Sequence, residues 1–150
     1  MAMSRRLMNL KALIFCIMLF GLLAGCMSFP MVGSYGKNSF QGTARYNTLS
    51  GTSRILLEGA TTKMRCEGDS YATYAPLLTL SGAGYGGKGE LRCDDGNFFR
   101  VRWESTSWGK GFGIALDQNR DKFFFVYGMD DAEAKEFITK ELLEGKRRLD

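Results

Sequence analysis

The 150-residue sequence contains no histidine. Its absence excludes Ser-His-Asp and Cys-His nucleophile systems and imidazole metal sites, and it removes the usual general base near neutral pH. Glu58, Glu90 and Glu104 are candidate carboxylates for acid–base chemistry, but nothing in the sequence pairs two of them across one site. We therefore expect a protein that is not an enzyme and that uses no cofactor or metal.

The sequence also lacks an apolar run of the length that a membrane-spanning helix requires. The uncharged apolar stretch at residues 12–25 has 14 residues, whereas a spanning helix needs about 20. Arg5, Arg6 and Lys11 precede this stretch, and no acidic residue occurs in residues 1–25. A basic start, a short apolar run and small residues at its end predict a secretory signal peptide over residues 1–25.

The predicted signal ends in Leu23-Ala24-Gly25-Cys26, which resembles the lipobox of bacterial lipoprotein precursors. The resemblance implies that the chain is cut before Cys26 and that this residue carries acyl chains such as palmitate. Several acyl chains give a stable membrane anchor. Met27 stands where an aspartate retains enteric lipoproteins at the inner membrane, which implies the outer membrane and a domain facing the periplasm. The alternatives are an ordinary signal peptide followed by a chance cysteine and an uncleaved anchor.

The mature part has nearly balanced charge. The chain has 20 basic and 16 acidic residues, and three of the basic ones lie in the predicted signal. A net charge near zero gives no reason to expect nucleic-acid binding. The 125 residues from Cys26 onward are enough for one domain with a modest core.

Two cysteines remain after the predicted lipidation site. Cys16 belongs to the signal and Cys26 to the anchor, which leaves Cys66 and Cys93 as an even pair in an exported domain. Such a pair predicts a disulfide bond. Two buried thiols are the alternative.

Apolar and polar residues alternate with a period of two from residue 40 onward, which predicts antiparallel β-structure. The predicted strands are 40–46, 54–58, 63–67, 77–81, 89–94, 97–105, 111–116 and 122–127. Residues 26–39 are small and polar and contain Pro30, which predicts a flexible tether before a β domain at 40–128. We expect a mainly β fold, a small antiparallel β-sandwich or barrel of about eight strands with one C-terminal helix.

The hairpin at 89–104 allows a more detailed prediction. A three-residue loop with Gly96 in the left-handed conformation would pair Cys93 with Asn97 and Leu91 with Phe99. A two-residue turn would instead mix apolar and charged residues on each face, so we expect the three-residue loop. The residues predicted to share the core face are Leu91, Cys93, Phe99, Val101 and Trp103.

Residues 129–150 predict a helix and tail. Asp130 and Asp131 can cap a helix, and apolar residues then follow helical spacing up to Gly145. We expect this helix to dock on the sheet or at a barrel mouth; a helix that binds a partner is the alternative. The strand at 122–127 is apolar throughout, which indicates that both of its faces are covered.

Two loops resemble ligand-binding motifs only in part. Residues 81–89 are rich in glycine and contain Lys88, but a phosphate loop would open a helix, and a strand is predicted here. Residues 117–121 alternate like the start of a calcium loop, but they lack its glycine and its final glutamate. We expect a hairpin loop at the first and a polar turn at the second.

A basic face is the most suggestive predicted surface. Four cationic side chains would lie on the outer side of the 89–104 hairpin beside Phe98: Lys88, Arg92, Arg100 and Arg102. Such a face suits phosphate groups of lipids or an acidic partner. The alternative is an ordinary polar face, balanced by Glu90 and Glu104.

Residues 64–128 carry the pattern Cys-x-Gly…Gly-x-Gly-Glu-Leu-x-Cys-x-Asp-Gly…Gly-x-Gly…Phe-x-Phe. The pattern resembles small exported proteobacterial β-proteins, and that resemblance implies no catalytic residues. We expect a lipid-anchored accessory or structural subunit of an envelope assembly, whose partners are the membrane and an envelope protein. The second hypothesis is a barrel that binds a lipid or a small apolar ligand. The third is a hydrolase that uses carboxylates.

Overall fold

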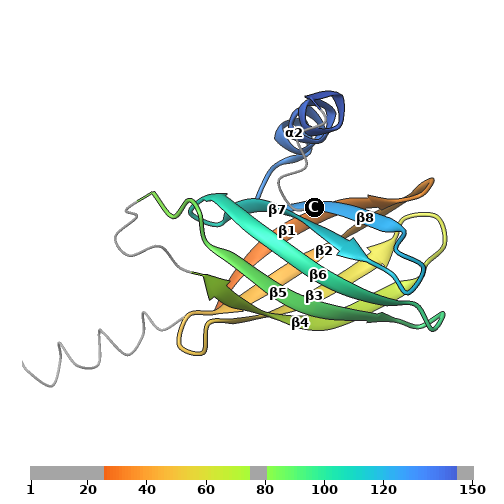
Figure 1. Cartoon of the computed structure of the whole chain (residues 1–150), viewed down its shortest axis with the longest axis horizontal. Helices are drawn as coiled ribbons and strands as arrows, with labels where there is room; N and C mark the ends of the chain where they lie inside the picture. The colour runs from red at the N-terminus through yellow and green to blue at the C-terminus, as the bar shows by residue number, and fades with distance from the viewer. Residues whose placement is uncertain (1–25, 75–80, 145–150) are drawn as a thin grey trace, which may run out of the picture.

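The computed structural model describes residues 26–74 and 81–144, the last four of these as backbone only. Eight antiparallel strands form a closed barrel in which each strand pairs with the next and β1 pairs with β8 (Figure 1). The elements are β1 (Cys26–Tyr35), β2 (Asn38–Asn47), β3 (Thr52–Gly59), β4 (Arg65–Tyr74), β5 (Gly86–Cys93), β6 (Phe98–Ser107), β7 (Lys110–Leu116), β8 (Lys122–Tyr127) and α2 (Asp131–Glu144). The predicted fold class is confirmed, and the barrel is the form that the structure takes.

Period-two alternation positions the core. Along β2 to β6 most apolar residues point into the barrel and most polar residues face outward, because successive side chains of a strand lie on opposite faces. The fully buried large side chains are Phe40, Phe125, Met31, Leu91, Val101 and Val126. The first five of these belong to the barrel interior, whereas Val126 belongs to a second cluster outside the wall.

The predicted tether at 26–39 is wrong for this structure. Residues 26–35 form β1, which pairs with β2 along its whole length and with β8 from Met31 to Tyr35. Pro30 fits in the strand because it lies one residue beyond that β8 pairing, where a missing N–H interrupts little of the ladder. Its carbonyl oxygen still accepts a hydrogen bond from the N–H of Gly128 at 2.8 Å. The barrel therefore begins at Cys26.

Other predicted strand limits differ less. The strand predicted at 63–67 is β4, which begins at Arg65 and extends to Tyr74, with an irregular register between Ala72 and Tyr74. The strand predicted at 77–81 lies outside the described residues except for Ser81, which belongs to a turn. The remaining predicted strands each correspond to a strand of the barrel.

The predicted β5–β6 hairpin is confirmed in register and in loop type. Leu91 pairs with Phe99, and the N–H of Cys93 donates to the carbonyl oxygen of Asn97 at 2.8 Å. Gly96 has a φ of 89°, the left-handed conformation that this three-residue loop requires. The predicted disulfide is also present, since Cys66 and Cys93 face each other across β4 and β5 and are bonded.

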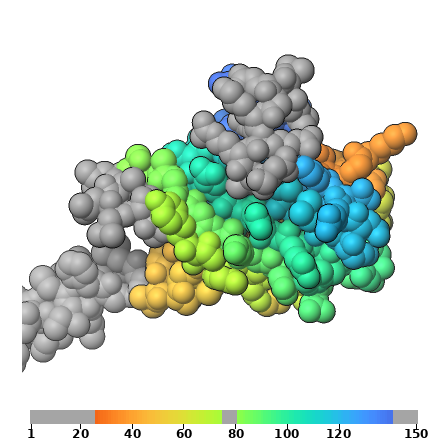
Figure 2. Space-filling view, in the orientation of Figure 1, coloured from red at the N-terminus to blue at the C-terminus, as the bar shows by residue number. Residues whose placement is uncertain are grey.

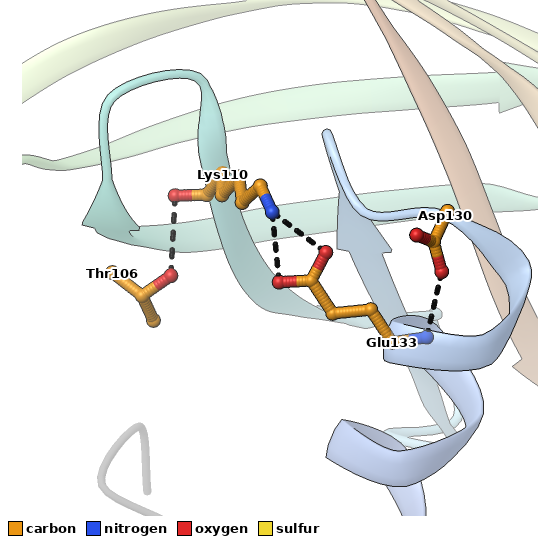
Figure 3. Close-up of polar contacts among 4 residues, drawn as sticks. All are labelled: Thr106, Lys110, Asp130 and Glu133. Carbon is orange, nitrogen blue, oxygen red and sulfur yellow. Dashed lines mark hydrogen bonds and ion pairs between the residues drawn. The ribbon is translucent and has the colours of Figure 1, made fainter.

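Helix α2 begins as the sequence predicts. The N–H of Glu133 donates to the Asp130 carboxylate at 2.8 Å, which makes Asp130 the N-cap residue. The Glu133 carboxylate in turn accepts hydrogen bonds from Lys110 Nζ at 2.7 and 2.9 Å, and this ion pair ties the first turn of the helix to the start of β7 (Figure 3). Thr106, across the β6–β7 turn, donates to the carbonyl oxygen of Lys110 at 3.4 Å. Among the described residues no helix is long and apolar enough to cross a membrane.

The helix packs on the outside of the barrel wall (Figure 1). Its apolar side joins outward-facing side chains of β7, β8 and β1 in one cluster: Val32, Phe112, Phe124, Val126, Met129, Ala134, Phe137 and Ile138. The rings of Phe112 and Phe137 lie 5.3 Å apart at their centroids. This cluster covers the outer face of β8, as expected from a strand that is apolar throughout. The inner face of β8 contributes Phe123 and Phe125 to the core. Of the two predicted positions for the helix, on the sheet or at the barrel mouth, the structure shows the first.

Candidate binding site at the open end of the barrel

One end of the barrel is filled. Aromatic rings meet there with centroid distances of 5.4 Å between Phe40 and Phe123, 5.9 Å between Phe99 and Phe123, and 5.2 Å between Tyr35 and Phe99. Met64 and the disulfide of Cys66 pack beside them. We call this the closed end; it carries the β1–β2, β3–β4, β5–β6 and β7–β8 turns, and the orange β1–β2 hairpin projects from it in Figures 1 and 2.

A polar latch spans the closed end. The Tyr35 hydroxyl donates to the Asp117 carboxylate at 2.8 Å, which with burial raises the pKa of Tyr35 to about 12. Burial alone would raise the pKa of Asp117, but hydrogen bonds from Tyr35 and from the backbone N–H groups of Asp121 and Asn119 hold it below its ordinary value. The carboxylate is thus used by the protein itself, and the described residues contain no cluster of three or more metal ligands. The polar-turn interpretation of residues 117–121 accounts for this stretch.

The opposite end of the barrel contains a cavity of about 160 Å³. We call this the open end; the β2–β3 and β6–β7 turns lie there, with the start of β1 and the end of β8. The cavity wall is predominantly apolar: Met27, Phe29, Met31, Ala44, Tyr46, Ile55, Ala72, Tyr85, Trp103, Trp108, Phe125 and Tyr127 contribute to it. Aromatic side chains therefore line a cavity at the open end and fill the barrel at the closed end.

The cavity exists because inward positions near the open end carry small residues. Ser70, Ala72 and Ser105 line the cavity from inward positions of their strands. The corresponding inward positions at the closed end carry phenylalanine. The neighbouring glycines give room to the rings themselves. A Cβ on Gly87 would lie 2.4 Å from the Trp103 ring, and one on Gly111 would contact Tyr127, so these rings lie against bare backbone.

The segment 81–85 borders this cavity and is held by one serine. Ser105 Oγ donates to the carbonyl oxygen of Gly82 at 2.7 Å and accepts from the N–H of Tyr85 at 2.9 Å. Trp108 adds a backbone bond, with its N–H donating to the carbonyl oxygen of Ser81 at 3.1 Å. Residues from Gly86 onward form β5 rather than a helix. The phosphate-loop pattern is therefore a turn followed by a strand, as expected.

Two polar groups in the wall lack ordinary solvation. The indole N–H of Trp103 is buried and has no hydrogen-bond acceptor in the described part of the chain. An unsatisfied buried donor costs about 1–3 kcal/mol. Burial and the nearby charge of Glu104 raise the pKa of Tyr127 well above its ordinary value. The cavity wall is thus apolar, and the Trp103 N–H is enclosed within that wall with almost no surface facing the cavity.

The predicted basic face lies on the outer wall. Lys88 and Arg92 project from β5, and Arg100 and Arg102 from β6, with Lys88 paired opposite Arg102. The guanidinium of Arg92 lies 5.2 Å from the centroid of the Phe98 ring. None of these four cations forms an ion pair with a described residue. They share this face with carboxylates, and Arg54 binds Glu67 at 3.3 Å and Asp69 at 3.5 Å.

The three candidate carboxylates do not form one site. Glu58 faces Arg65 at 3.9 Å on the outer wall, Glu90 is exposed and stands opposite Arg100, and Glu104 lies opposite Phe112. All three are on the outside of the barrel, away from the cavity. These three glutamates therefore do not pair with one another as a site for hydrolysis would require.

Comparison of the chain with known protein families, with curated proteins and with solved structures gave no match. The cavity is accordingly described from its own residues. Sequence reasoning missed Ser105 and Tyr85, which shape the open end, and missed Met27 and Phe29 because they were placed in a tether. The alternation Met27, Phe29, Met31 in a segment with only one proline was the signal that could have found β1.

Proposed function

We propose that the protein is a non-enzymatic, lipid-anchored cell-envelope protein whose barrel binds one apolar group at its open end. The apolar cavity of about 160 Å³ is the observation that supports this function. An eight-stranded barrel has an interior that side chains can fill or that can hold one small ligand. Here the closed end follows the first pattern and the open end the second.

The cavity volume limits the ligand. Drug-sized ligands occupy pockets of about 300–1,000 Å³, which is more than this cavity offers. An apolar cavity of about 150 Å³ holds benzene. The ligand that fits is therefore a single ring or the end of an acyl chain, with any remainder of the molecule outside the mouth.

Binding can be tested with decanoate as the probe, by titration calorimetry on the purified protein. Ala72 lines the cavity, so Ala72→Leu should weaken binding at least about tenfold by occupying the mouth. Ala60 is exposed in the turn of the closed end, and the matched Ala60→Leu variant should bind as the unchanged protein does. Equal affinity in both variants, or no binding by the unchanged protein, would contradict the proposal.

The anchor is tested at Cys26, the exposed free cysteine at the start of β1. Cys26→Ala should give an unlipidated precursor or a soluble product, seen as the loss of acyl mass and of membrane retention. Anchoring at the outer membrane, facing the periplasm, follows from the same proposal and from Met27. Unchanged acylation and retention in this variant would refute the lipobox interpretation.

Four cations on β5 and β6 form no ion pair with a described residue, and they favour a second candidate function, an accessory subunit that contacts an acidic envelope partner. Crosslinking in intact cells should then capture a stoichiometric partner that is lost in Arg100→Glu/Arg102→Glu. Arg45 is an exposed residue of β2 outside that face, and Arg45→Glu is the matched control. Capture that survives the double reversal would contradict this candidate.

A further inference from the structure

Exposed apolar side chains gather around the mouth of the barrel. Met27, Leu49, Tyr74 and Trp108 lie on the strand ends and turns of the open end, and they are 43%, 83%, 63% and 66% exposed. We call these four residues the open rim. Away from this end, Leu56 and Leu116 are the exposed large aliphatic residues, at 39% and 37%. Exposed apolar side chains that gather on one part of the surface indicate a contact surface.

The charged side chains of the strand-connecting turns lie at the closed end. The described turn residues of the open end, 48–51, 81–85 and 108–109, include no charged side chain. The turns of the closed end carry Lys37, Lys63, Asp94, Asp95, Asp117, Arg120 and Asp121. The turns that join strands at the open end are thus uncharged, and the charged residues of that end, Lys110, Asp130, Asp131 and Glu133, lie together where α2 begins. Uncharged turns that carry exposed apolar side chains suit the interface of a lipid bilayer.

The start of the barrel lies on the same rim. Cys26 is the first residue of β1 and pairs with Asn47, the last residue of β2, beside the β2–β3 turn that carries Leu49. Because no tether separates Cys26 from the strand, anything attached to this cysteine is held within a few residues of the mouth.

We propose that the open rim inserts into the interface of the membrane, so that the cavity opens onto lipid. Tryptophan and tyrosine are favoured at the boundary between acyl chains and headgroups, where their rings meet apolar chains and their polar atoms meet water. Trp108 and Tyr74 occupy that position here, and Leu49 and Met27 supply apolar contact. The docking is independent of whether the cavity binds a ligand. In this orientation an acyl chain of the membrane can enter the cavity without crossing water.

The two tryptophans of the chain provide the test. The protein is extracted from its own membranes as the Trp103→Phe variant, which leaves Trp108 as the reporter, and is reconstituted in phosphatidylcholine vesicles. Replacing the lipid by one brominated near the top of its acyl chains should lower Trp108 emission by about half or more, because bromine quenches only at contact depth. A closed-end reporter is made by Leu116→Trp in a Trp103→Phe/Trp108→Phe background, and its emission should not change.

Each alternative gives a different result. Quenching of the closed-end reporter equal to that of Trp108, or no quenching of Trp108, would overturn the proposal. A blue shift of Trp108 emission without quenching by the brominated lipid would show that a second copy or another protein covers the rim, and would also overturn it. Adding Ala72→Leu should leave Trp108 quenching intact, so failure of ligand binding and failure of membrane docking are distinguished.

Discussion

The two ends of the barrel are built from the same eight strands and differ in almost every physical property. The closed end is filled by aromatic rings, bridged by the disulfide of Cys66 and Cys93, latched by Tyr35 and Asp117, and surrounded by charged turns. The open end has small inward residues, a cavity and an uncharged apolar rim. The difference teaches that the contacts that fill the core and the cavity of the proposed binding site lie at separate levels of one wall. Binding regions are generally drawn from the less constrained parts of a fold.

Removing a ring at each end is the strongest test of this division. Phe123 is buried against Phe40 and Phe99, so Phe123→Ala should cost about 3–5 kcal/mol of unfolding free energy through the cavity that it creates. Phe29→Ala at the mouth should cost roughly half as much, because this ring is only half-buried and already borders empty space. Urea unfolding of both variants compares the two costs. Equal costs would remove the distinction between the ends.

The disulfide should contribute about 3–4 kcal/mol, as expected from closing a loop of this length in the unfolded chain. The cysteines are 27 residues apart and staple β4 to β5 at the closed end. Cys66→Ala/Cys93→Ala should therefore lower the urea midpoint while decanoate affinity at the open end stays nearly unchanged. Loss of binding together with stability would mean that the two ends are coupled. Thiol labelling of the unfolded, unreduced protein should find neither cysteine free.

Tyr35→Phe should have a smaller, pH-dependent effect. It removes the hydrogen bond to Asp117 and should cost about 1–2 kcal/mol at pH 7. The folded-state pKa of Asp117 is lowered, so the stabilisation is present above its unfolded pKa of about 3.9 and is lost as the pH falls through the folded value.

At alkaline pH the stabilisation from Tyr35 is lost as the pH rises, whereas that from Asp117 is lost as the pH falls. The pKa of Tyr35 is raised to about 12 in the folded state, so its contribution is complete below the unfolded value of about 10 and is lost as the pH rises towards the folded value. The difference in unfolding free energy between Tyr35→Phe and the unchanged protein should therefore narrow at both extremes. Urea unfolding at pH 3, 7 and 11 measures it. A difference independent of pH would assign the effect to packing instead of to the latch.

Local patterns predicted the local structure well. The register of the β5–β6 hairpin followed from one rule, that Leu91 must oppose Phe99 for the apolar face to be continuous, and the structure confirms it. The pairing of Cys66 with Cys93 and the cap at Asp130 were likewise predicted from nearby residues. These features depend on interactions that the sequence order already contains.

Features that depend on distant residues were missed. β1 was assigned to a tether because Pro30 and several small residues weaken the strand signal, and its stability comes from pairing with β8 near the far end of the chain. The sequence raised a cavity only as an alternative and did not predict its position. Its position depends on which small side chains share a level in the closed barrel, and Ser70, Ala72 and Ser105 lie on separate strands. The basic face was placed correctly, but its lack of ion pairs needed the structure.

The pairing of β1 with β8 also determines how the chain can fold. Each other strand can pair with its neighbour as soon as that neighbour is available, whereas β1 acquires its second partner only when residues 122–127 arrive. Contacts between such distant segments are slow to form. A chain that stopped before β8 would be an open sheet with β1 and β7 as bare edges, and bare edges promote aggregation. Nascent or truncated forms of this protein therefore need protection until the last strand closes the barrel.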